Sequence, residues 1–383
     1  MNSLPYIAVV ATLLLLYWCE QKPRGVPSAR AKMSEAAGWA AFAVMLIFIG
    51  FRGHLYSDFI NYYPFYNALP DIFHLNTSFL KRYLFEPGFV VYSSLIKSLG
   101  FDYFGWVAIG TLIDLAIYRQ LFRRYTDSVV LPFIFFMAYN GLTIEFNLYR
   151  NAKAMDLFLL SLPALERRHV VRYMALNLLG TTFHLSSVVY LPLYFLLHRP
   201  MCRALRWGGI VFANIILLGG VSLIGEILQS LEAFRAMAFY DKFLRHATNG
   251  TAGYALSFGH IERTFTIVLF TAMYDRLERS RPSNRIFYNC LWLYYISFML
   301  LHEVEVFVDR IPTLFVCGYW VLYSNISTMK WRWRQVVMLV AIVLAMAKIT
   351  IANQSIAARY ENRIWGITSY RERRSEVTPL LYK

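Results

Sequence analysis

Charged residues are scarce in this sequence. Asp, Glu, Lys and Arg make up 16% of the 383 residues, whereas an average soluble protein contains about a quarter. Hydrophobic residues account for 58% and aromatic residues for 17%. Many separate apolar stretches have the length of membrane helices, and the sequence predicts an all-α, polytopic membrane helix bundle. We expect about 11–13 transmembrane or re-entrant helices in a single integral membrane domain over residues 1–383.

Motifs for nucleotides and metals are absent. The sequence contains no P-loop, no paired-glycine fingerprint, no GxSxG and no DxD-like acidic pair, and its HEVE string lacks the second His of HExxH. The four cysteines have no metal-site spacing, and we expect no disulfide, since the topology below places them in the membrane or on its cytoplasmic side. We therefore expect no metal and no cofactor. Chemistry fed by a cytoplasmic nucleotide does not fit these absences.

Positive charge predominates, with a net charge of +15. Such a balance can indicate nucleic-acid binding, but most basic residues fall in short loops between apolar segments, as the positive-inside rule requires. We therefore expect contact with membrane lipid and not with nucleic acid. The basic clusters predicted on the cytoplasmic side are Arg119, Arg123 and Arg124; Arg167, Arg168 and Arg172; Arg199, Arg203 and Arg206; Arg276, Arg279, Arg281 and Arg285; and Lys330, Arg332 and Arg334.

The same alternation places three polar segments on the outer face. Residues 4–18 are apolar and are followed, not preceded, by basic residues, which predicts an uncleaved first helix with its N-terminus outside. The outer segments are then the loops 51–85 and 225–262 and the tail 353–383. The tail is basic, so its outer position conflicts with the charge rule. Either it packs over an outer site or the count is wrong by one span.

Two segments interrupt the alternation. Residues 86–99 cannot span if both of their neighbours are outside, so we expect a re-entrant or interfacial helix opened by Pro87. Residues 173–198 are rather short for two spans and predict a broken hairpin with Thr181, Thr182, Phe183 and His184 at its tip. Non-helical backbone at membrane depth is tolerated only inside protein or beside a wet cavity. Both irregularities therefore point to a site.

Residues 51–89 are the most promising candidate site. They combine Arg52, Asp58 and Glu86 with the tyrosines Tyr62, Tyr63 and Tyr66, a mixture that suits sugars and phosphates beside a bilayer. The alternative is interfacial anchoring, because Tyr and Arg favour the headgroup zone.

Ionisable residues at three further places in the chain are also candidate site residues. Arg150 and Lys153 lie at the predicted outer start of a helix and can share one face; function and snorkelling to headgroups are both open. His184, between apolar runs, is either functional or a satisfied structural group. Arg310 closes a third outer cluster with Glu303, Glu305 and Asp309.

Four stretches in order resemble one family. FRGHLYSDFINYYPFY, FEPGFVVYSSLIKSLG, NLYRNAKAMDLFLLSLP and FHLSSVVYLPLY resemble the EpsG-like group of Wzy-type polysaccharide polymerases. The resemblance implies a bacterial inner-membrane glycosyltransferase, with a GT-C-like architecture, that acts at the periplasmic face. Such enzymes transfer a glycan chain from undecaprenyl diphosphate to the non-reducing end of a lipid-linked repeat unit, in O-antigen, capsule or exopolysaccharide assembly. The implied partners are this lipid-linked oligosaccharide, a flippase and a chain-length regulator.

Residue types then suggest roles. Arginine suits the leaving diphosphate through its planar fork, so Arg52, Arg150 and Arg310 are candidates, with Lys153 in support. A general base must take the acceptor proton; Asp58 is the first choice, with His184 and Glu86 as alternatives. Tyr62, Tyr63 and Tyr66 would stack on sugar rings. The competing hypotheses are a flippase of the same lipids, although no internal repeat is evident, and a membrane O-acyltransferase.

Overall fold

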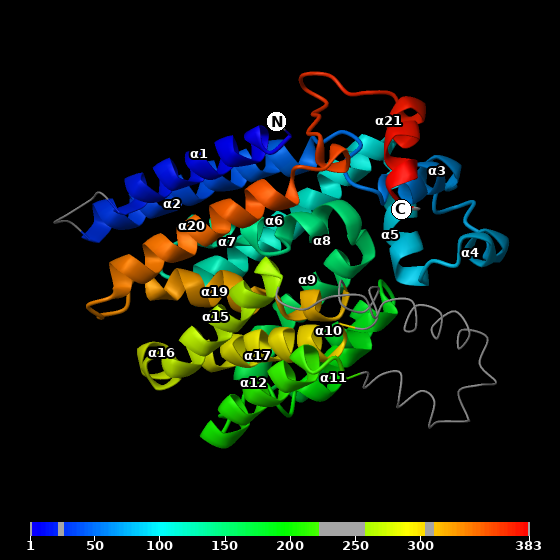
Figure 1. Ribbon diagram of the computed structural model, residues 1–383. Helices are drawn as coiled ribbons and strands as arrows, with labels where there is room; N and C mark the ends of the chain where they lie inside the picture. Colours follow the sequence, from blue (N-terminus) through cyan, green and yellow to red (C-terminus); the bar gives the residue numbers. More distant parts are fainter. Residues whose placement is uncertain (1, 22–26, 222–256, 303–309, 382–383) are drawn as a thin grey trace. The chain divides into compact units, whose positions relative to one another are not determined.

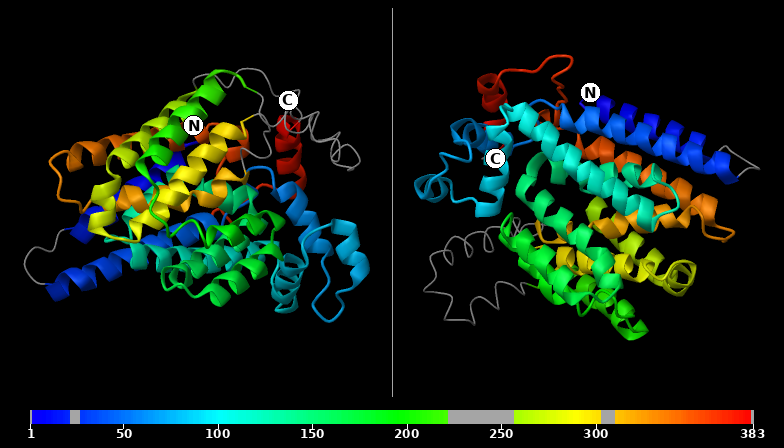
Figure 2. Two further views of the ribbon diagram at one scale, coloured as in Figure 1. Left: turned by 90° about the horizontal axis from the view of Figure 1, so that it is seen from below. Right: turned by 180° about the vertical axis from the view of Figure 1, so that it is seen from behind.

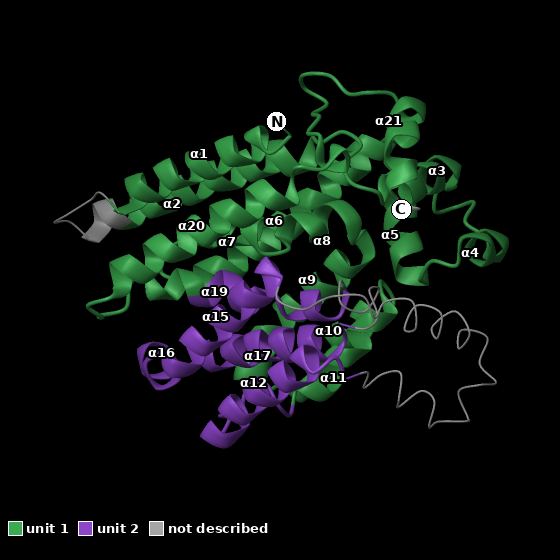
Figure 3. Ribbon diagram, in the orientation of Figure 1, with its two compact units in different colours: residues 1–194, 323–383 green, residues 195–322 purple. Residues whose placement is uncertain are grey.

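The chain folds into helices that form two compact units. The computed structural model describes residues 2–21, 27–221, 257–302 and 310–381 (Figure 1). Within these ranges the regular structure is helical, with isolated backbone bridges and no strand, so the expected all-α class is confirmed. One unit comprises residues 1–194 and 323–383, and the other residues 195–322 (Figure 3). The expectation of a single integral membrane domain stays a prediction.

The first unit is built around long, roughly aligned helices. In it, α1 packs on α2, α7 and α20, while α6 packs on α9 and on the turn η1 that extends α2 (Figures 1 and 2). Its elements are α1 (Leu4–Gln21), α2 (Pro27–Met45), η1 (Leu46–Gly50), α3 (Phe59–Ala68), α4 (Thr77–Tyr83), α5 (Pro87–Ser98), α6 (Tyr103–Tyr125), α7 (Leu131–Ala138), α8 (Gly141–Asn147), α9 (Tyr149–Glu166), α10 (Val170–Thr181), η2 (Leu185–Val189), α11 (Tyr190–Leu193), α20 (Arg334–Ala352), η5 (Ile356–Ala358), α21 (Tyr370–Val377) and η6 (Thr378–Leu381).

Three described helices are long and apolar enough to cross a membrane: Leu4–Gln21, Ala31–Gly50 and Arg334–Ala352. Apolar side chains such as Leu15 and Leu339 are exposed on them, which suits contact with lipid. A fourth span is obtained if α5 and α6 form one bent span. The other described helices are shorter, broken or less apolar, and the expected total of about 11–13 spanning or re-entrant helices stays a prediction.

The helix predicted to open at Pro87 is present, and its re-entrant or interfacial position stays a prediction. α5 begins at Pro87, where the missing N–H is no loss because the first turn has no intrahelical acceptor for it. α6 follows at an angle of 117°, the geometry of a broken span or a re-entrant loop.

The break predicted near His184 is confirmed. α10 ends at Thr181, and a short turn leads into the 3₁₀ helix η2 and the single turn α11. α10 packs back on α9, where the Asn177 amide donates to Ser161 Oγ at 3.0 Å. The ring of Phe158 in α9 stacks on Tyr190 with centroids 3.9 Å apart.

The C-terminal tail packs on the loop that follows η1. Arg363 N–H donates to the Phe51 carbonyl at 2.7 Å, and Gly53 N–H to the Glu361 carbonyl at 2.8 Å. Figure 1 shows α21 beside α3, and Tyr370 Oη donates to the Ile60 carbonyl at 3.1 Å. This contact supports the first alternative for the tail, packing over residues 51–60. The side of the membrane on which both lie stays a prediction.

Arg373 holds this contact together. Its side chain is fully buried and pairs with Glu376. The guanidinium also donates to four carbonyls, those of His54, Ile356, Ala357 and Arg359, at 2.9–3.1 Å. One side chain thus joins the loop to residues 356–359 of the tail.

The second unit centres on α17, which packs on α12, α15 and η4. Most of the predicted loop 225–262, and Glu303, Glu305 and Asp309, lie outside the described residues. Arg310 is exposed in this unit, and its role in diphosphate binding stays a prediction. The elements are α12 (Arg203–Leu218), α15 (Phe258–Ala272), α16 (Tyr274–Ser280), α17 (Asn284–Leu300), η4 (Pro312–Phe315) and most of α19 (Cys317–Ile326).

Arg373→Ala should release the tail from the loop. It removes the donor that joins the buried His54 carbonyl to three carbonyls of the tail, and loss of a donor to a buried group costs about 1–3 kcal/mol. We expect a lower Tm for the detergent-solubilised protein and faster subtilisin cleavage within residues 353–381. Arg371→Ala removes an exposed arginine of the same helix and is the matched control. Equal Tm values and cleavage rates for the two variants would show that Arg373 does not hold the tail.

Candidate functional site

Arg150 lies where several elements of the first unit converge. It is the second residue of α9, and its guanidinium pairs with Glu86, the residue before α5. Arg150 Nε donates to Tyr62 Oη at 3.1 Å, and the guanidinium lies 4.6 Å from the centroid of the Phe85 ring. Arg150 and Glu86 are both about one-fifth exposed. The structure thus brings together Arg150, Glu86 and Tyr62, three of the predicted site residues.

The two helix breaks meet beside this pair. Gly88 and Phe89 N–H donate to the Thr182 carbonyl at 2.9 and 3.3 Å, and Leu185 N–H donates to Glu86 Oε1 at 3.3 Å. A β-carbon on Gly88 would lie 2.8 Å from the Thr182 carbonyl oxygen, so the approach requires glycine. Backbone groups freed by one break are therefore satisfied by the other.

His184 stands in the second break, half-buried. Its Nδ1 lies 2.7 Å from Ser186 Oγ and accepts the Ser186 N–H at 3.1 Å. Ser186 Oγ in turn lies 3.5 Å from Asn151 Oδ1, one residue after Arg150. His184 is thus oriented next to the Arg150 end of α9, and its catalytic role stays a prediction.

Asp58 lies at the start of α3 and is half-buried. The backbone N–H groups of Ser57 and Asp58 donate to Asn147 Oδ1 at 3.0 and 3.2 Å, which ties the loop to the end of α8. Burial raises the pKa of the Tyr62 hydroxyl, the nearby Asp58 carboxylate raises it further, and Arg150 opposes both. Asp58 and Arg150 therefore act on the same hydroxyl.

The predicted tyrosine platform is only partly present. Tyr66 is fully buried, stacked on Trp106, and Tyr62 is 5% exposed, packed on Tyr149. These two rings belong to an aromatic core and offer no open face, which corrects the expectation of three exposed stacking rings. Tyr63 is partly exposed, and its ring stacks on Tyr370 of α21 with centroids 4.5 Å apart. The cause is the apolar setting, where large rings bury one another.

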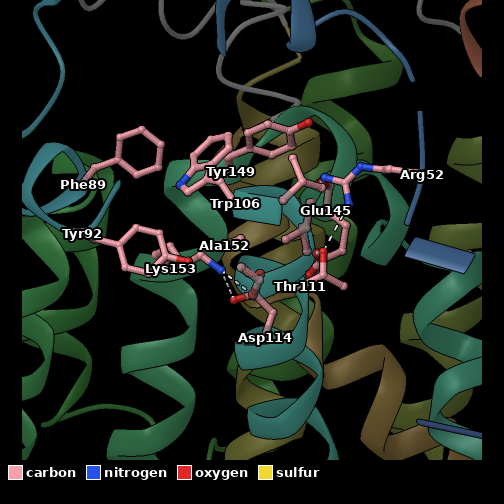
Figure 4. Close-up of a pocket in the computed structure, with 13 residues that line it drawn as sticks. Arg52, Phe89, Tyr92, Trp106, Thr111, Asp114, Glu145, Tyr149, Ala152 and Lys153 are labelled. Carbon is pink, nitrogen blue, oxygen red and sulfur yellow. Dashed lines mark hydrogen bonds and ion pairs between the residues drawn. The ribbon is translucent and has the colours of Figure 1, made fainter. Parts of the chain in front are cut away.

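Arg52 and Lys153 line a separate small cavity between α6, α8 and α9 (Figure 4). Arg52 donates to the Ile49 carbonyl at 2.7 Å and to Thr111 Oγ1 at 3.2 Å; Lys153 pairs with Asp114 and donates to the Gly110 carbonyl at 2.8 Å. The cavity has a volume of about 30 Å³, room for one or two water molecules but not for a sugar. Lys153 thus contacts α6 and not the partners of Arg150, and its supporting role in diphosphate binding stays a prediction.

The family of the chain can now be stated. A model of the EpsG family matches residues 37–364, most of the chain, including Arg150, Glu86 and Tyr62. The chain belongs to the EpsG family. Membership indicates polysaccharide biosynthesis by a glycosyltransferase-like polymerase in a membrane. No curated protein and no solved structure matches the chain.

Buried acids are the feature that the sequence analysis missed. Asp114, Glu145 and Asp156 are each at most 3% exposed beside Arg52 and Lys153. Asp156 lies next to Asp114, with which it shares a hydrogen bond when one of the two carboxyl groups carries a proton. The cluster of three acids and two cations is neutral when one carboxyl group carries a proton, and a buried net charge is costly. The available signal was one acid in each apolar run, which by default suggests function.

His54 is a second residue whose burial the sequence did not predict. It is 2% exposed among the rings of Phe59, Tyr63, Phe104 and Tyr370. Burial lowers the pKa of the imidazole to about 4, with Glu361 opposing and Arg373 assisting. At neutral pH His54 is therefore uncharged and serves as packing between the loop and the tail.

Gly88→Ala should separate the two helix breaks. The added methyl group meets backbone at Thr182, which cannot rotate away, and overpacking costs about 1–3 kcal/mol. We expect a lower Tm than for the parent protein in the same detergent. Gly208→Ala in α12 is the control, since a β-carbon there meets open space. An unchanged Tm for Gly88→Ala would mean that the breaks do not depend on this approach.

Proposed function

We propose that this protein is an inner-membrane polysaccharide polymerase. In this proposal it transfers a glycan chain from undecaprenyl diphosphate to the non-reducing end of a lipid-linked repeat unit at the periplasmic face. An acceptor hydroxyl attacks the anomeric carbon, the glycosidic bond forms, the bond to the diphosphate breaks and a base takes the proton. The observation that carries the proposal is the Arg150–Glu86–Tyr62 cluster at the meeting point of the two helix breaks, in a chain of the EpsG family.

Arg150 is the group best placed to hold the diphosphate. It starts an 18-residue helix, whose N-terminus already favours an anion. Negative charge on the leaving group grows in the transition state, so a fixed cation there lowers the barrier. Tyr62 and Phe85 restrict the guanidinium, which reduces the entropy lost on binding.

The Glu86 carboxylate competes with any incoming anion for the Arg150 guanidinium. A diphosphate that bound Arg150 would displace the Glu86 carboxylate from the guanidinium, although Leu185 N–H would still hold one of its oxygens. The released carboxylate would then lie beside the bound donor, where a base is needed. Asp58 reaches the same region from α3, and His184 from η2. All three remain candidates. Glu86 pairs directly with Arg150, whereas Asp58 acts on the Tyr62 hydroxyl through its charge.

Lys153 and Arg52 support the site indirectly in this proposal. Lys153 lies one helical turn from Arg150 and joins α9 to α6 through Asp114. Arg52 joins η1 to the end of α8 through the Ile49 and Glu145 carbonyls. Both fix the backbone that presents Arg150. Tyr63 is the tyrosine that keeps a partly exposed ring for a sugar.

The same proposal includes a GT-C-like architecture, with a flippase and a chain-length regulator as partners. It also includes a role in O-antigen, capsule or exopolysaccharide assembly. The test is incubation of purified protein with lipid-linked repeat units. A glycan ladder with released undecaprenyl diphosphate supports a polymerase. Movement of intact lipid between leaflets without release would indicate a flippase, and acylated glycan an O-acyltransferase.

Arg150→Lys should lower polymerisation clearly, because lysine keeps the charge but loses the two-pronged contact. Arg150→Ala should lower it further, by roughly tenfold to a hundredfold for a charge-assisted hydrogen bond. Ladder length and undecaprenyl diphosphate release are measured at matched membrane levels. Arg263→Lys, at a partly buried arginine of the second unit, controls for general loss of stability. Full activity of Arg150→Lys would reduce Arg150 to an anchor or a point charge.

Asp58→Asn and Glu86→Gln separate the two carboxylates. Loss of a general base costs about 10²–10⁴ in rate, so the variant that removes the base should lose most of kcat while still binding donor. If Glu86 only neutralises Arg150, Glu86→Gln should tighten or preserve donor binding with little change in kcat. Rates are measured across pH, where loss of the base also removes the acidic limb of the profile. Near-normal rates in both variants would transfer the role to His184.

A further inference from the structure

The turn between α9 and α10 carries a basic hollow that the proposed function does not use. The hollow has a volume of about 580 Å³ and lies at the end of α9 opposite Arg150. Its polar lining is basic, consisting of Arg167, Arg168, His169 and Arg172. Such a hollow, with positive charge and no acidic lining residue, attracts an anion.

Two of these arginines are available for a ligand. Arg167 and Arg172 are exposed and make no ion pair within the described ranges. The nearest acid in sequence, Glu166, accepts instead from Arg124 at 2.8 Å and from Tyr125 Oη at 3.0 Å. Arg168 is engaged with Tyr194, whose ring centroid lies 4.7 Å from the guanidinium.

The start of α10 adds a second anion-binding feature. α10 is 12 residues long, and its N-cap, His169, makes no side-chain capping bond. The first backbone bond of the helix runs from Tyr173 N–H to the His169 carbonyl. The N–H groups of Val170, Val171 and Arg172 precede this bond and have no acceptor within the helix, and these residues line the hollow, where a phosphate oxygen would satisfy the N–H groups.

An apolar stripe leads away from the hollow along α10. Val171 is 79% exposed, Leu178 53% and Leu179 49%, and Ala175 between them is also exposed. These positions follow the spacing of one helix face. A ligand that fits both features has a phosphate at one end and hydrocarbon along the other.

We propose that this hollow is a binding site for an anionic phospholipid. The phosphate lies between Arg167, Arg172 and the start of α10, and an acyl chain follows Val171 and Leu178. A free phosphate has the same headgroup chemistry but gains nothing from the stripe. A diffuse basic surface would attract lipid at any loop of equal charge.

The test uses the full chain in neutral detergent, titrated with phosphatidylglycerol, phosphatidylcholine or inorganic phosphate. Bound lipid is counted by native mass spectrometry, and Tm is followed in parallel. We expect phosphatidylglycerol to bind at least tenfold more tightly than phosphatidylcholine. Arg167→Gln with Arg172→Gln should remove about tenfold or more of that affinity, as expected for charge-assisted contacts.

Two further variants decide between the alternatives. Lys330→Gln with Arg332→Gln removes the same charge from another exposed basic turn and should leave phosphatidylglycerol binding unchanged. Val171→Gln with Leu178→Gln should weaken phosphatidylglycerol but not inorganic phosphate. If the Arg167/Arg172 and the Lys330/Arg332 double variants lose equal affinity for phosphatidylglycerol, the lipid binds a diffuse basic surface and the proposed site is wrong. Phosphate binding as tight as that of phosphatidylglycerol, with no effect of the stripe, would overturn the lipid.

Discussion

Wherever a helix stops inside an apolar protein, its freed backbone groups must find partners within the protein. In the first unit, the two breaks satisfy this need for each other: the Thr182 carbonyl accepts from the start of α5, and Glu86 accepts from the start of η2. This mutual pairing fixes Glu86 at the N-terminus of α9, where Arg150 neutralises it. The cluster at the proposed site is thus a consequence of how the breaks are paired.

The buried charged side chains near the Arg150–Glu86–Tyr62 cluster must also find partners within the protein. Asp114, Glu145 and Asp156 come from α6, α8 and α9. Figure 4 shows Lys153 beside Asp114, and Arg52 on the side of Glu145. Removing one member would leave an uncompensated charge, which is more costly than never having the pair. The charges therefore fix the register of three helices, and with it the position of Arg150, without contact to a substrate. The cavity between them is too small for a sugar.

The sequence predicted the helix breaks because their causes are local. Pro87 cannot continue a helix from its N-terminal side, and basic residues at both ends of 173–198 leave too few residues for two spans. The sequence could not predict contacts between distant segments. Neither Arg373 nor His54 lies in a local pattern that indicates its partner 319 residues away. The burial of the tyrosines could not be predicted for a related reason. Tyr62, Tyr63 and Tyr66 are the same residue type in one short stretch, but different neighbouring rings cover them.

An arginine that is already paired binds weak anions poorly, and the pairing thereby sets which anion it binds. A ligand must offer more to the Arg150 guanidinium than the Glu86 carboxylate does, and must also offset the loss of that ion pair. A single weak negative charge gains little by this exchange, whereas a diphosphate brings several oxygens and more charge to the same planar group and to the helix N-terminus. In the proposed function, Glu86 therefore selects for the lipid diphosphate over lesser anions, and becomes free to accept a proton only once that donor is bound.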